Sequence, residues 1–465
     1  MIRLFRHYIS RALLTLLVAE SLYLLLSVYL GGFLNGIRFG QSSLPPFDEA
    51  LSSGLAFALV MITIMIAMGL YERNLWNGRG DMFLRVGISF LFGLFAMTLV
   101  YYFSPEMAPS RSEFSLAFGI AFIGVSLLRF VFFKASDHEL LKRRVLVLGV
   151  GQNAGRLEEL QKRRNMGFSI LGYIQVHEDE KPGVPPERMR QVTSTLLDLT
   201  DELQIDEIVV AMDDRRKGFP VDEVLRCKIE GISISAVLDF FEQETGKIQL
   251  EALRPSNMIF SFGFNKMPIN RAVKRLFDLI ASLLLLAVTW PFMLFAALAI
   301  WIESGGRGPI LYRQVRVGRN DLPFELIKFR SMSVDAEQDG IARWAQARDN
   351  RITRVGGILR ETRIDELPQL FNVLWGHMSF VGPRPERPQF VAELNKKIPF
   401  YSMRHIVNPG ITGWAQICYP YGASDQDARE KLQYDLYYIK NYSFFFDVII
   451  MLQTVHTILW GKGAH

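Results

Sequence analysis

Long apolar runs separated by short polar loops dominate the first third of the chain. Four of them are close to the roughly 20 residues that a helix needs to cross a bilayer, and they cover residues 13–34, 51–70, 86–103 and 114–133. Basic residues cluster before the first run, between the second and third, and after the fourth, and the positive-inside rule places these flanks in the cytoplasm. The pattern predicts a four-helix transmembrane bundle over residues 1–136, with residues 36–49 and 104–113 on the outer side. Few charges interrupt the runs, which favours an anchor over a transport path; Glu20 is the exception, and we expect it to face the bundle interior.

A fifth apolar run, residues 279–302, has Pro291 near its centre and basic residues on both sides. A proline inside a helix removes a hydrogen bond and kinks the helix, and basic flanks at both ends disfavour a crossing. We predict a re-entrant helix–break–helix that dips into the inner leaflet; an ordinary span with a proline kink is the alternative. A last apolar stretch, residues 444–460, is short and interrupted by polar residues, which is typical of an interfacial helix.

Between these membrane segments, residues 143–253 alternate short β-rich runs with helical patterns. This alternation predicts an α/β Rossmann-like domain with a parallel sheet, followed by a linker over residues 254–270. Gly149, Gly151 and Ala154 (or Gly155) follow the first strand and match the dinucleotide fingerprint GxGxxG/A. The chain has no Tyr-x-x-x-Lys pair. We therefore favour a structural or regulatory module and leave open a bound nucleotide or nucleotide sugar.

Composition agrees with a membrane protein. Half of the 465 residues are hydrophobic and the mean hydropathy is +0.17, which the apolar runs explain. The formal net charge of +5 is modest and fits a surface that lies against anionic lipid better than one dedicated to nucleic acid. Two cysteines, Cys227 and Cys418, do not make a disulfide framework, so we expect the soluble parts in a reducing cytoplasm.

The strongest chemical signal is an adjacent carboxylate pair, Asp365 and Glu366, in a stretch rich in arginine (residues 351–387). Carboxylates attack phosphorus or hold a divalent metal, and arginines bind phosphate in a bidentate fashion. Successive side chains diverge on a regular helix or strand, so both carboxylates share one pocket only from a turn or a helix start, and Pro368 is compatible with a first helical turn. Such a pair suits Mg²⁺ completed by substrate phosphates.

Basic residues around the pair are candidate phosphate ligands. Arg384 is fixed between two prolines, Lys328 and Arg330 alternate on an expected strand, and Arg351 and Arg354 are three apart and would share a helix face. Any of these residues would otherwise contact lipid headgroups or pair with acids. We also expect Trp375 and Trp414 to act as interfacial anchors.

From Arg271 onward the chain resembles the bacterial sugar transferases, also called monotopic phosphoglycosyl transferases or polyprenyl-phosphate hexose-1-phosphate transferases. The matching blocks are KRLFDL, the proline-broken apolar helix, GPILYRQVRVGRNDLPFELIKFRSM, RITRVGGILRETRIDELPQLFNVLWGHMSFVGPRPE and NPGITGWAQI. The layout with four spanning helices and a Rossmann-like module in front is similar to the large members that initiate exopolysaccharide or O-antigen synthesis. The tail over residues 419–441 is similar to the branch associated with PEP-CTERM/exosortase systems.

The resemblance implies a mainly α monotopic catalytic domain over residues 271–465, at the cytoplasmic face of the bacterial inner membrane. It implies transfer of a hexose-1-phosphate from a nucleotide-diphospho-sugar to polyprenyl (undecaprenyl) phosphate. In that reaction Asp365 attacks the β-phosphate to form a covalent phosphosugar, Glu366 assists, and the pair holds Mg²⁺. The family usually breaks its re-entrant helix at Ser-Pro, whereas this chain has Trp290-Pro291.

Two other functions remain open at this point: an NAD-dependent enzyme that modifies nucleotide sugars, and a non-catalytic scaffold of a polysaccharide export complex. Bound NAD would favour the first, and absence of nucleoside monophosphate release would favour the second. The large membrane bundle is compatible with a homodimer.

Overall fold

A computed structural model describes residues 2–4, 7–9, 11–38, 47–71, 79–137, 142–162, 167–177, 179–191, 195–214, 218–253, 268–334, 351–419, 422 and 424–459. The described chain divides mainly into two compact units, one ending at Gly246 and the other beginning at Lys247. Ahead of the first long helix, strands β1 (Ile2–Leu4) and β2 (His7–Ile9) pair in a small sheet.

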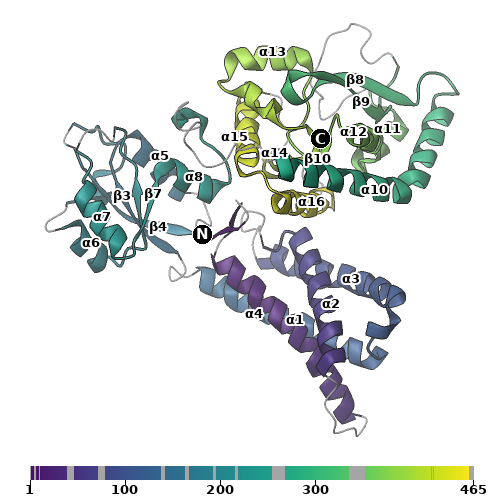
Figure 1. Ribbon diagram of the computed structural model, residues 1–465, viewed down its shortest axis with the longest axis horizontal. Helices are drawn as coiled ribbons and strands as arrows, with labels where there is room; N and C mark the ends of the chain where they lie inside the picture. The colour runs from purple at the N-terminus through teal and green to yellow at the C-terminus, as the bar shows by residue number, and fades with distance from the viewer. Residues whose placement is uncertain are drawn as a thin grey trace. The chain divides into compact units, whose positions relative to one another are not determined.

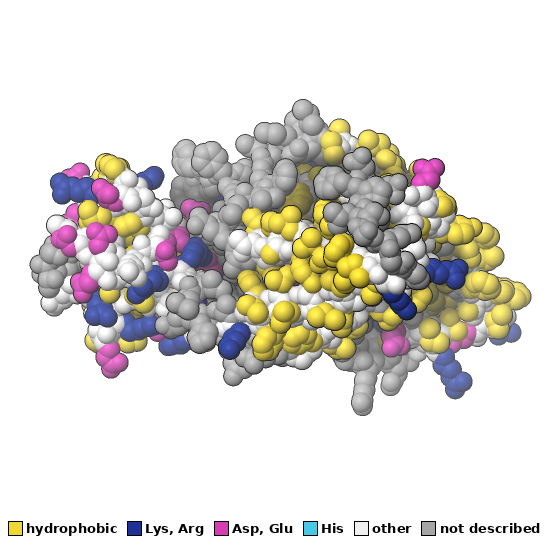
Figure 2. Space-filling model, turned by 90° about the horizontal axis from the view of Figure 1, so that it is seen from below, with side chains coloured by type: hydrophobic (Ala, Val, Ile, Leu, Met, Phe, Trp, Pro, Cys, Tyr) yellow, Lys and Arg dark blue, Asp and Glu magenta, His cyan; other side chains and the backbone are white. Residues whose placement is uncertain are grey.

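Four long helices follow. They are α1 (Arg11–Arg38), α2 (Phe47–Ala67), α3 (Arg79–Phe103) and α4 (Arg111–Asp137), with a 3-10 turn η2 (Pro105–Met107) between the last two. All four are long and apolar enough to cross a membrane, as the sequence predicts. Helices α1 and α4 lie side by side (Figure 1), and Gly31 permits their close approach, since a Cβ there would lie 2.7 Å from the Ala117 nitrogen. Figure 2 shows hydrophobic side chains gathered over these helices.

Glu20 faces the interior of these helices, as predicted. Its side chain is fully buried, pairs with Arg129 at 2.8 Å, and accepts a hydrogen bond from the Tyr71 hydroxyl at 2.5 Å. Arg129 also donates to the Leu70 carbonyl at 2.8 Å. Arg129, which neutralises the buried acid, thus connects α1, α4 and the turn after α2. The hydropathy pattern did not reveal this partner.

The α/β domain has a five-stranded parallel sheet. Its strands are β3 (Arg143–Leu148), β4 (Phe168–Ile174), β5 (Met189–Arg190), β6 (Glu207–Val210) and β7 (Ser233–Ala236), in the spatial order β5-β4-β3-β6-β7. Its helices are α5 (Gln152–Gln161), α6 (Leu196–Glu202), α7 (Val221–Ile229) and α8 (Val237–Thr245), with a 3-10 turn η4 (Pro186–Arg188). Numbered within the domain, the strand order is 3-2-1-4-5, as in doubly wound sheets.

Alternation along the central strand β3 explains the two-sided packing. Val145 and Val147 join an apolar cluster with residues of α5 and α8, whereas Leu146 and Leu148 join a second cluster with residues of α6 and α7. Because successive side chains of a strand point to opposite faces, helices cover both faces of the sheet. The parallel α/β prediction is confirmed.

The second unit is mainly helical, as expected. Its helices are α10 (Pro268–Glu303), α11 (Arg354–Glu361), α12 (Gln369–Trp375), α13 (Pro388–Lys397), α14 (Trp414–Cys418), α15 (Asp425–Asn441) and α16 (Phe444–Leu459). Strands β8 (Leu311–Val317) and β9 (Pro323–Phe329) form an antiparallel hairpin, and β10 (Ser379–Val381) pairs in parallel with β11 (Gly410–Thr412). Its 3-10 turns are η5 (Leu250–Ala252), η6 (Arg319–Asp321), η7 (Ile364–Glu366) and η8 (Tyr401–Ile406).

The boundary between the units differs from the predicted one at residue 253. Lys247 pairs with Glu430 at 2.6 Å, and the Ile248 amide donates to the Gln433 carbonyl at 3.1 Å. These contacts attach Lys247 and Ile248 to α15, where the polar groups of a segment without a sheet partner find hydrogen-bond partners. Most of the predicted linker lies outside the described residues, and α10 already begins at Pro268.

Helix α10 has 36 residues and runs through Pro291 without interruption, whereas the sequence predicted a break there. A proline kinks a helix without necessarily ending it, and Figure 1 shows α10 changing direction along its length. It is the fifth described helix that is long and apolar enough to cross a membrane. Only 11% of its most apolar 18-residue stretch is buried within the protein. Its last turns pack on β9 and α11 through Ala296 and Ile300.

Candidate active site

The carboxylate pair sits on η7, a single 3-10 turn between two helices. Thr353 caps α11 by accepting a hydrogen bond from the Gly356 amide at 2.9 Å. After α11, Arg363 adopts a left-handed conformation (φ 59°) that redirects the chain into η7. Pro368 then precedes α12. The prediction of a turn at a helix start is confirmed, and this turn brings Asp365 and Glu366 to one region of the unit.

Three cations surround Glu366: Lys328 and Arg384 come from other parts of the unit, and Arg363 directly precedes η7. The Oε1 atom of Glu366 lies 2.9 Å from Lys328 Nζ, 3.4 Å from Arg384 Nη2 and 3.8 Å from Arg363 Nη1. Burial alone would raise the pKa of Glu366, but Lys328, Arg384 and Arg363 together outweigh burial and hold this pKa well below its usual range. Glu366 is therefore ionised at any physiological pH.

Asp365 has the opposite perturbation. Its side chain is 7% exposed, and burial raises its pKa above the usual range. Lys328 offsets part of that rise, whereas the neighbouring charge of Glu366 adds to it. Two adjacent carboxylates with pKa values displaced in opposite directions are typical of a functional site rather than a solvated surface pair.

Arg384 reaches the pair from a turn that the β10–β11 ladder holds. The Gly382 amide donates to the Thr412 carbonyl at 2.9 Å, and the Gly410 amide donates to the Pro383 carbonyl at 2.9 Å. A Cβ on Gly382 would lie 2.3 Å from the Asn408 carbonyl oxygen, so only glycine fits this close backbone approach.

The Arg384 guanidinium also donates to Gln416 Oε1 at 3.1 Å. Gln416 lies on α14, at the carboxyl end of β11, and sequence reasoning did not single it out. Its only signal was its place in the NPGITGWAQI block.

The other predicted phosphate ligands lie elsewhere. Arg330 follows β9 and is buried, and its guanidinium donates to the Arg307 carbonyl at 3.4 and 3.5 Å rather than reaching toward Glu366 as Lys328 does. Arg351 and Arg354 do not share a helix face, because α11 begins only at Arg354, after the Thr353 cap. The carbonyl of Arg351 instead accepts the Ser333 amide at 2.9 Å.

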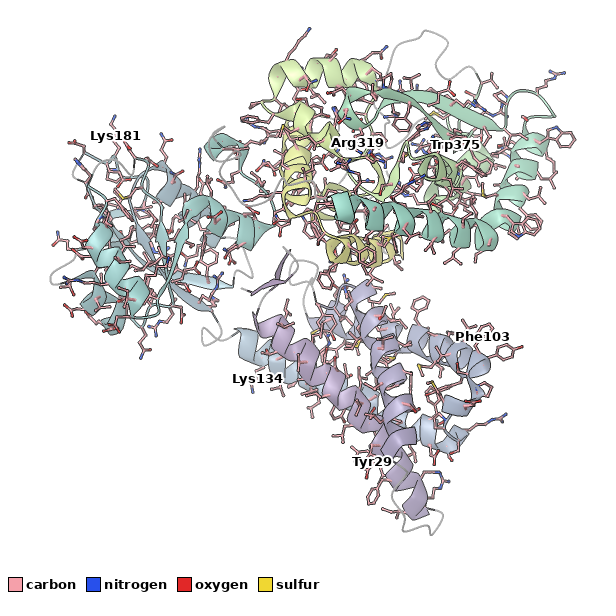
Figure 3. All side chains as sticks on the ribbon, viewed as in Figure 1. Tyr29, Phe103, Lys134, Lys181, Arg319 and Trp375 are labelled. Carbon is pink, nitrogen blue, oxygen red and sulfur yellow. The ribbon has the colours of Figure 1, made fainter. Side chains whose placement is uncertain are left out.

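The two predicted tryptophan anchors have different environments. Trp375, labelled in Figure 3, is 59% exposed, which is compatible with an interfacial position. Trp414 is buried and its ring packs against Tyr437 and Phe446, so the prediction of an anchor there was wrong. The sequence around an aromatic residue next to a glycine turn does not show whether its side chain faces lipid or the protein core.

Polar residues near the start of α10 bind two elements beside the site: β10, which leads to Arg384, and α12, which follows the carboxylate pair. Asp278 Oδ1 accepts hydrogen bonds from Ser379 Oγ at 3.0 Å and the Phe380 amide at 3.1 Å, which fixes β10. Arg275 donates to the carbonyls of Val373 and Leu374 at the end of α12, both at 2.5 Å. These contacts give the KRLFDL block a physical role that the sequence pattern alone did not reveal.

The donor set of the site limits the metals it suits. Within the described ranges no group of three or more His, Cys, Asp or Glu side chains is placed to hold a metal ion. Asp365 and Glu366 supply two carboxylates. That set fits magnesium, which commonly takes one or two protein carboxylates and completes its shell with substrate phosphates and water.

A carboxylate of the same domain binds the amides that follow the glycine turn of the α/β domain. Gly149 has a φ of 116°, and Gly151 precedes α5. The amides of Gln152 and Asn153, at the helix start where a pyrophosphate binds in dinucleotide domains, donate instead to the Asp213 carboxylate at 2.9 and 3.1 Å. This geometry favours the structural interpretation of the glycine pattern over a dinucleotide site.

Comparison with known proteins agrees with the geometry. Residues 269–461 match the family model "Bacterial sugar transferase". A UDP-N-acetylgalactosamine-undecaprenyl-phosphate N-acetylgalactosaminephosphotransferase of Aeromonas hydrophila is 41% identical over 272 residues, which cover 58% of this chain and 63% of that protein. A UDP-glucose:undecaprenyl-phosphate glucose-1-phosphate transferase of Klebsiella pneumoniae is 34% identical over 70% of this chain and 69% of its own length. A transferase of the same name from Xanthomonas campestris pv. campestris is 28% identical over 90% of this chain and 88% of its own.

The match to the Klebsiella protein extends well beyond the catalytic unit, and the five long apolar helices make the chain a membrane protein. The chain thus belongs to the bacterial sugar transferase family, in the large form that carries apolar helices and an α/β domain ahead of the catalytic unit.

Proposed function

We propose that this protein transfers a sugar-1-phosphate from a UDP-sugar to undecaprenyl phosphate, and so begins the assembly of an exopolysaccharide or O-antigen-type glycan. The observation that carries the proposal is the buried Asp365 beside an ionised Glu366 that three cations surround. The names of the relatives supply the substrate class.

In the proposed reaction a carboxylate oxygen of Asp365 attacks the β-phosphorus of the nucleotide sugar. The bond from that phosphorus to the bridging oxygen breaks, and the nucleoside monophosphate leaves. A phosphate oxygen of undecaprenyl phosphate then attacks the same phosphorus and releases Asp365. Attack by one anion on another needs positive charge nearby, and Lys328 and Arg384, which lie beside Glu366, would supply it.

Asp365 and Glu366 are the residues that would hold magnesium. When bound, the ion would offset phosphate charge during the transfer. Lys328 and Arg384 are the proposed phosphate ligands with the closest structural support, because each lies within 3.4 Å of Glu366. The phosphate-binding roles of Arg330, Arg351 and Arg354 stay as proposals that rest on the sequence alone.

We further propose that α10 is re-entrant, so that the catalytic unit lies at the cytoplasmic face of the inner membrane. In a straight helix, Asp278 and Glu303, which are 25 residues apart on α10, would lie about 38 Å apart. Yet Asp278 near its start holds β10, and Glu303 at its end accepts the Val355 amide at 3.0 Å, and both partners belong to one compact unit. One compact unit at both ends of a helix supports entry and exit on the same side of the bilayer.

The transferase proposal is tested with full-length protein in lipid nanodiscs. The assay follows release of nucleoside monophosphate from a panel of UDP-sugars, with undecaprenyl phosphate and magnesium, and intact-protein mass spectrometry detects the phosphosugar adduct. Asp365→Asn should abolish both signals. Asp425→Asn, the same change at an exposed residue of α15, should keep both. Adduct formation by Asp365→Asn would exclude it as the nucleophile.

The topology proposal is tested with single cysteines in a background where Cys227 and Cys418 are serine. A cysteine at Leu322, which is 66% exposed next to the β8–β9 turn, should resist a membrane-impermeant reagent added to intact cells. A cysteine at the exposed Met107, between α3 and α4, should react. Equal labelling at both positions would mean that α10 crosses the membrane.

A further inference from the structure

Arg404 contacts the turn that carries Arg384. It forms a buried polar cluster with Tyr401 and Asp435 that the proposed reaction does not use. It belongs to η8 and its side chain is only 6% exposed. Its Nη2 atom donates to the backbone carbonyl of Arg384 at 2.9 Å and lies 3.0 Å from Asp435 Oδ2. Its Nη1 atom donates to the Tyr401 hydroxyl.

A buried ion pair of this kind is a costly way to gain stability. Desolvation of the two charges consumes most of the attraction between them, and apolar residues of similar volume often stabilise a core as well. The planar guanidinium offers something else, because it donates in several fixed directions at once. Arg404 uses these directions to connect a backbone carbonyl of the site to Asp435 on α15.

Helix α15 reaches the same turn a second time. Tyr438 lies three residues after Asp435 and therefore on the same side of the helix. Its hydroxyl lies 3.1 Å from the Val381 carbonyl, where Lys274 also donates at 3.0 Å. The turn is thus held at Val381, before Gly382, and at Arg384, after it.

We propose that Arg404 is a positioning residue of the transferase, held by Asp435, that fixes the backbone of Arg384 so that its guanidinium stays between Glu366 and Gln416. This inference rests on the proposed role of Arg384 as a phosphate ligand. A shift of about 1 Å in a group that binds the reacting phosphate lowers the rate by as much as about 100-fold. Arg404 therefore acts on the reaction without touching the substrate.

The test is a double-mutant cycle on the full-length protein in nanodiscs. Arg404→Lys keeps the charge and removes the planar fork. It should lower kcat/KM for the UDP-sugar by about 10-fold and weaken the binding of UDP, measured by calorimetry, by a similar factor. In an Arg384→Ala background, where the side chain that Arg404 orients is absent, the same change should alter both values by less than about 2-fold. Arg429→Lys, the same substitution at a half-exposed residue of α15, should leave both values unchanged.

Thermal unfolding separates positioning from folding. A purely structural role would lower the thermal midpoint and reduce activity by the same factor in both backgrounds, and that additive result would overturn the inference. If Arg404→Lys does not fold, Asp435→Asn, which keeps the shape of the partner, should show the same non-additivity with Arg384→Ala. If Arg384→Ala by itself leaves UDP affinity and kcat/KM unchanged, the phosphate role of Arg384 fails and this inference fails with it. If Arg384→Ala weakens both and the cycle is additive, only the positioning role of Arg404 is wrong.

Discussion

Replacing Lys328 with methionine removes one charge from the carboxylate pair while keeping a similar side-chain volume. Lys328 Nζ lies 2.9 Å from Glu366 Oε1, and the two side chains are 21% and 12% exposed. A charge-assisted hydrogen bond contributes about 1.5–3 kcal/mol. Low exposure means that solvent screens this pair only weakly.

Lys328 lowers the pKa of both carboxylates, so its loss should raise both. If the reaction needs the charged pair, 1.5–3 kcal/mol corresponds to a fall in kcat/KM of about 10- to 150-fold. The acidic limb of the pH profile should move to higher pH by about one unit or more, because each unit of pKa corresponds to about 1.36 kcal/mol. Raising the pH should therefore restore part of the lost activity.

The measurement is release of nucleoside monophosphate as a function of pH, for wild type, Lys328→Met and a control. Lys397→Met is the matched control, since Lys397 pairs with Asp425 at 2.8 Å on the surface of α13. It should keep the wild-type rate and profile. A Lys328→Met protein with the wild-type kcat/KM and an unmoved acidic limb would show that the ion pair does not control the carboxylates, and the electrostatic reasoning would be refuted.

Three further predictions concern stability and the α/β domain. Asn372→Ala should lower the free energy of unfolding by about 2–4 kcal/mol and lower the thermal midpoint, because Asn372 accepts a hydrogen bond from the Ile327 amide at 3.0 Å and donates one to the Glu325 carbonyl at 2.7 Å. Asn395→Ala, on the exposed side of α13, should leave both quantities unchanged. Burial raises the pKa of Asp435 to about 6, so its ionisation as the pH rises from about 4 to 6 lowers the free energy of unfolding by about 3 kcal/mol. Over this rise in pH, wild type should lose stability relative to Asp435→Asn. A constant difference in stability between the two proteins would contradict this reasoning. Asp213→Ala should destabilise the α/β domain by about 0.5–2 kcal/mol, as loss of a helix cap does, and NAD released from denatured wild-type protein would contradict the capping interpretation.

Periodicity and charge were sufficient to predict the architecture. The four apolar runs became α1 to α4, and the strand–helix alternation became a parallel sheet with helices on both faces. These features depend on local patterns, namely length for a spanning helix and alternation for a strand. Boundaries were less predictable, because the attachment of Lys247 and Ile248 to α15 depends on partners far away in sequence.

The candidate site was only partly readable for the same reason. Asp365 and Glu366 stand out because two adjacent acids among arginines are chemically unusual, and Arg384 stands out between prolines. Gln416 and Arg404 carry no such signal, and their roles arise only when the fold brings them to Arg384, which lies 32 and 20 positions away from them in sequence. Conversely, Arg330 looks like Lys328 in sequence, yet its guanidinium binds the Arg307 carbonyl.

In the proposed arrangement, the contacts of α10 would connect membrane attachment to catalysis. Its first turns bond β10 through Asp278, and β10 leads directly into the turn with Arg384. Its last residue, Glu303, accepts an amide at the start of α11, and α11 leads into Asp365 and Glu366. Both halves of the site, the cation and the carboxylates, are therefore fixed to the two ends of one apolar helix. If α10 lies in the bilayer as proposed, a change in its position would alter the spacing between them. We therefore expect activity to depend on bilayer thickness, whereas a site built on a helix that served only as an anchor would be insensitive to it.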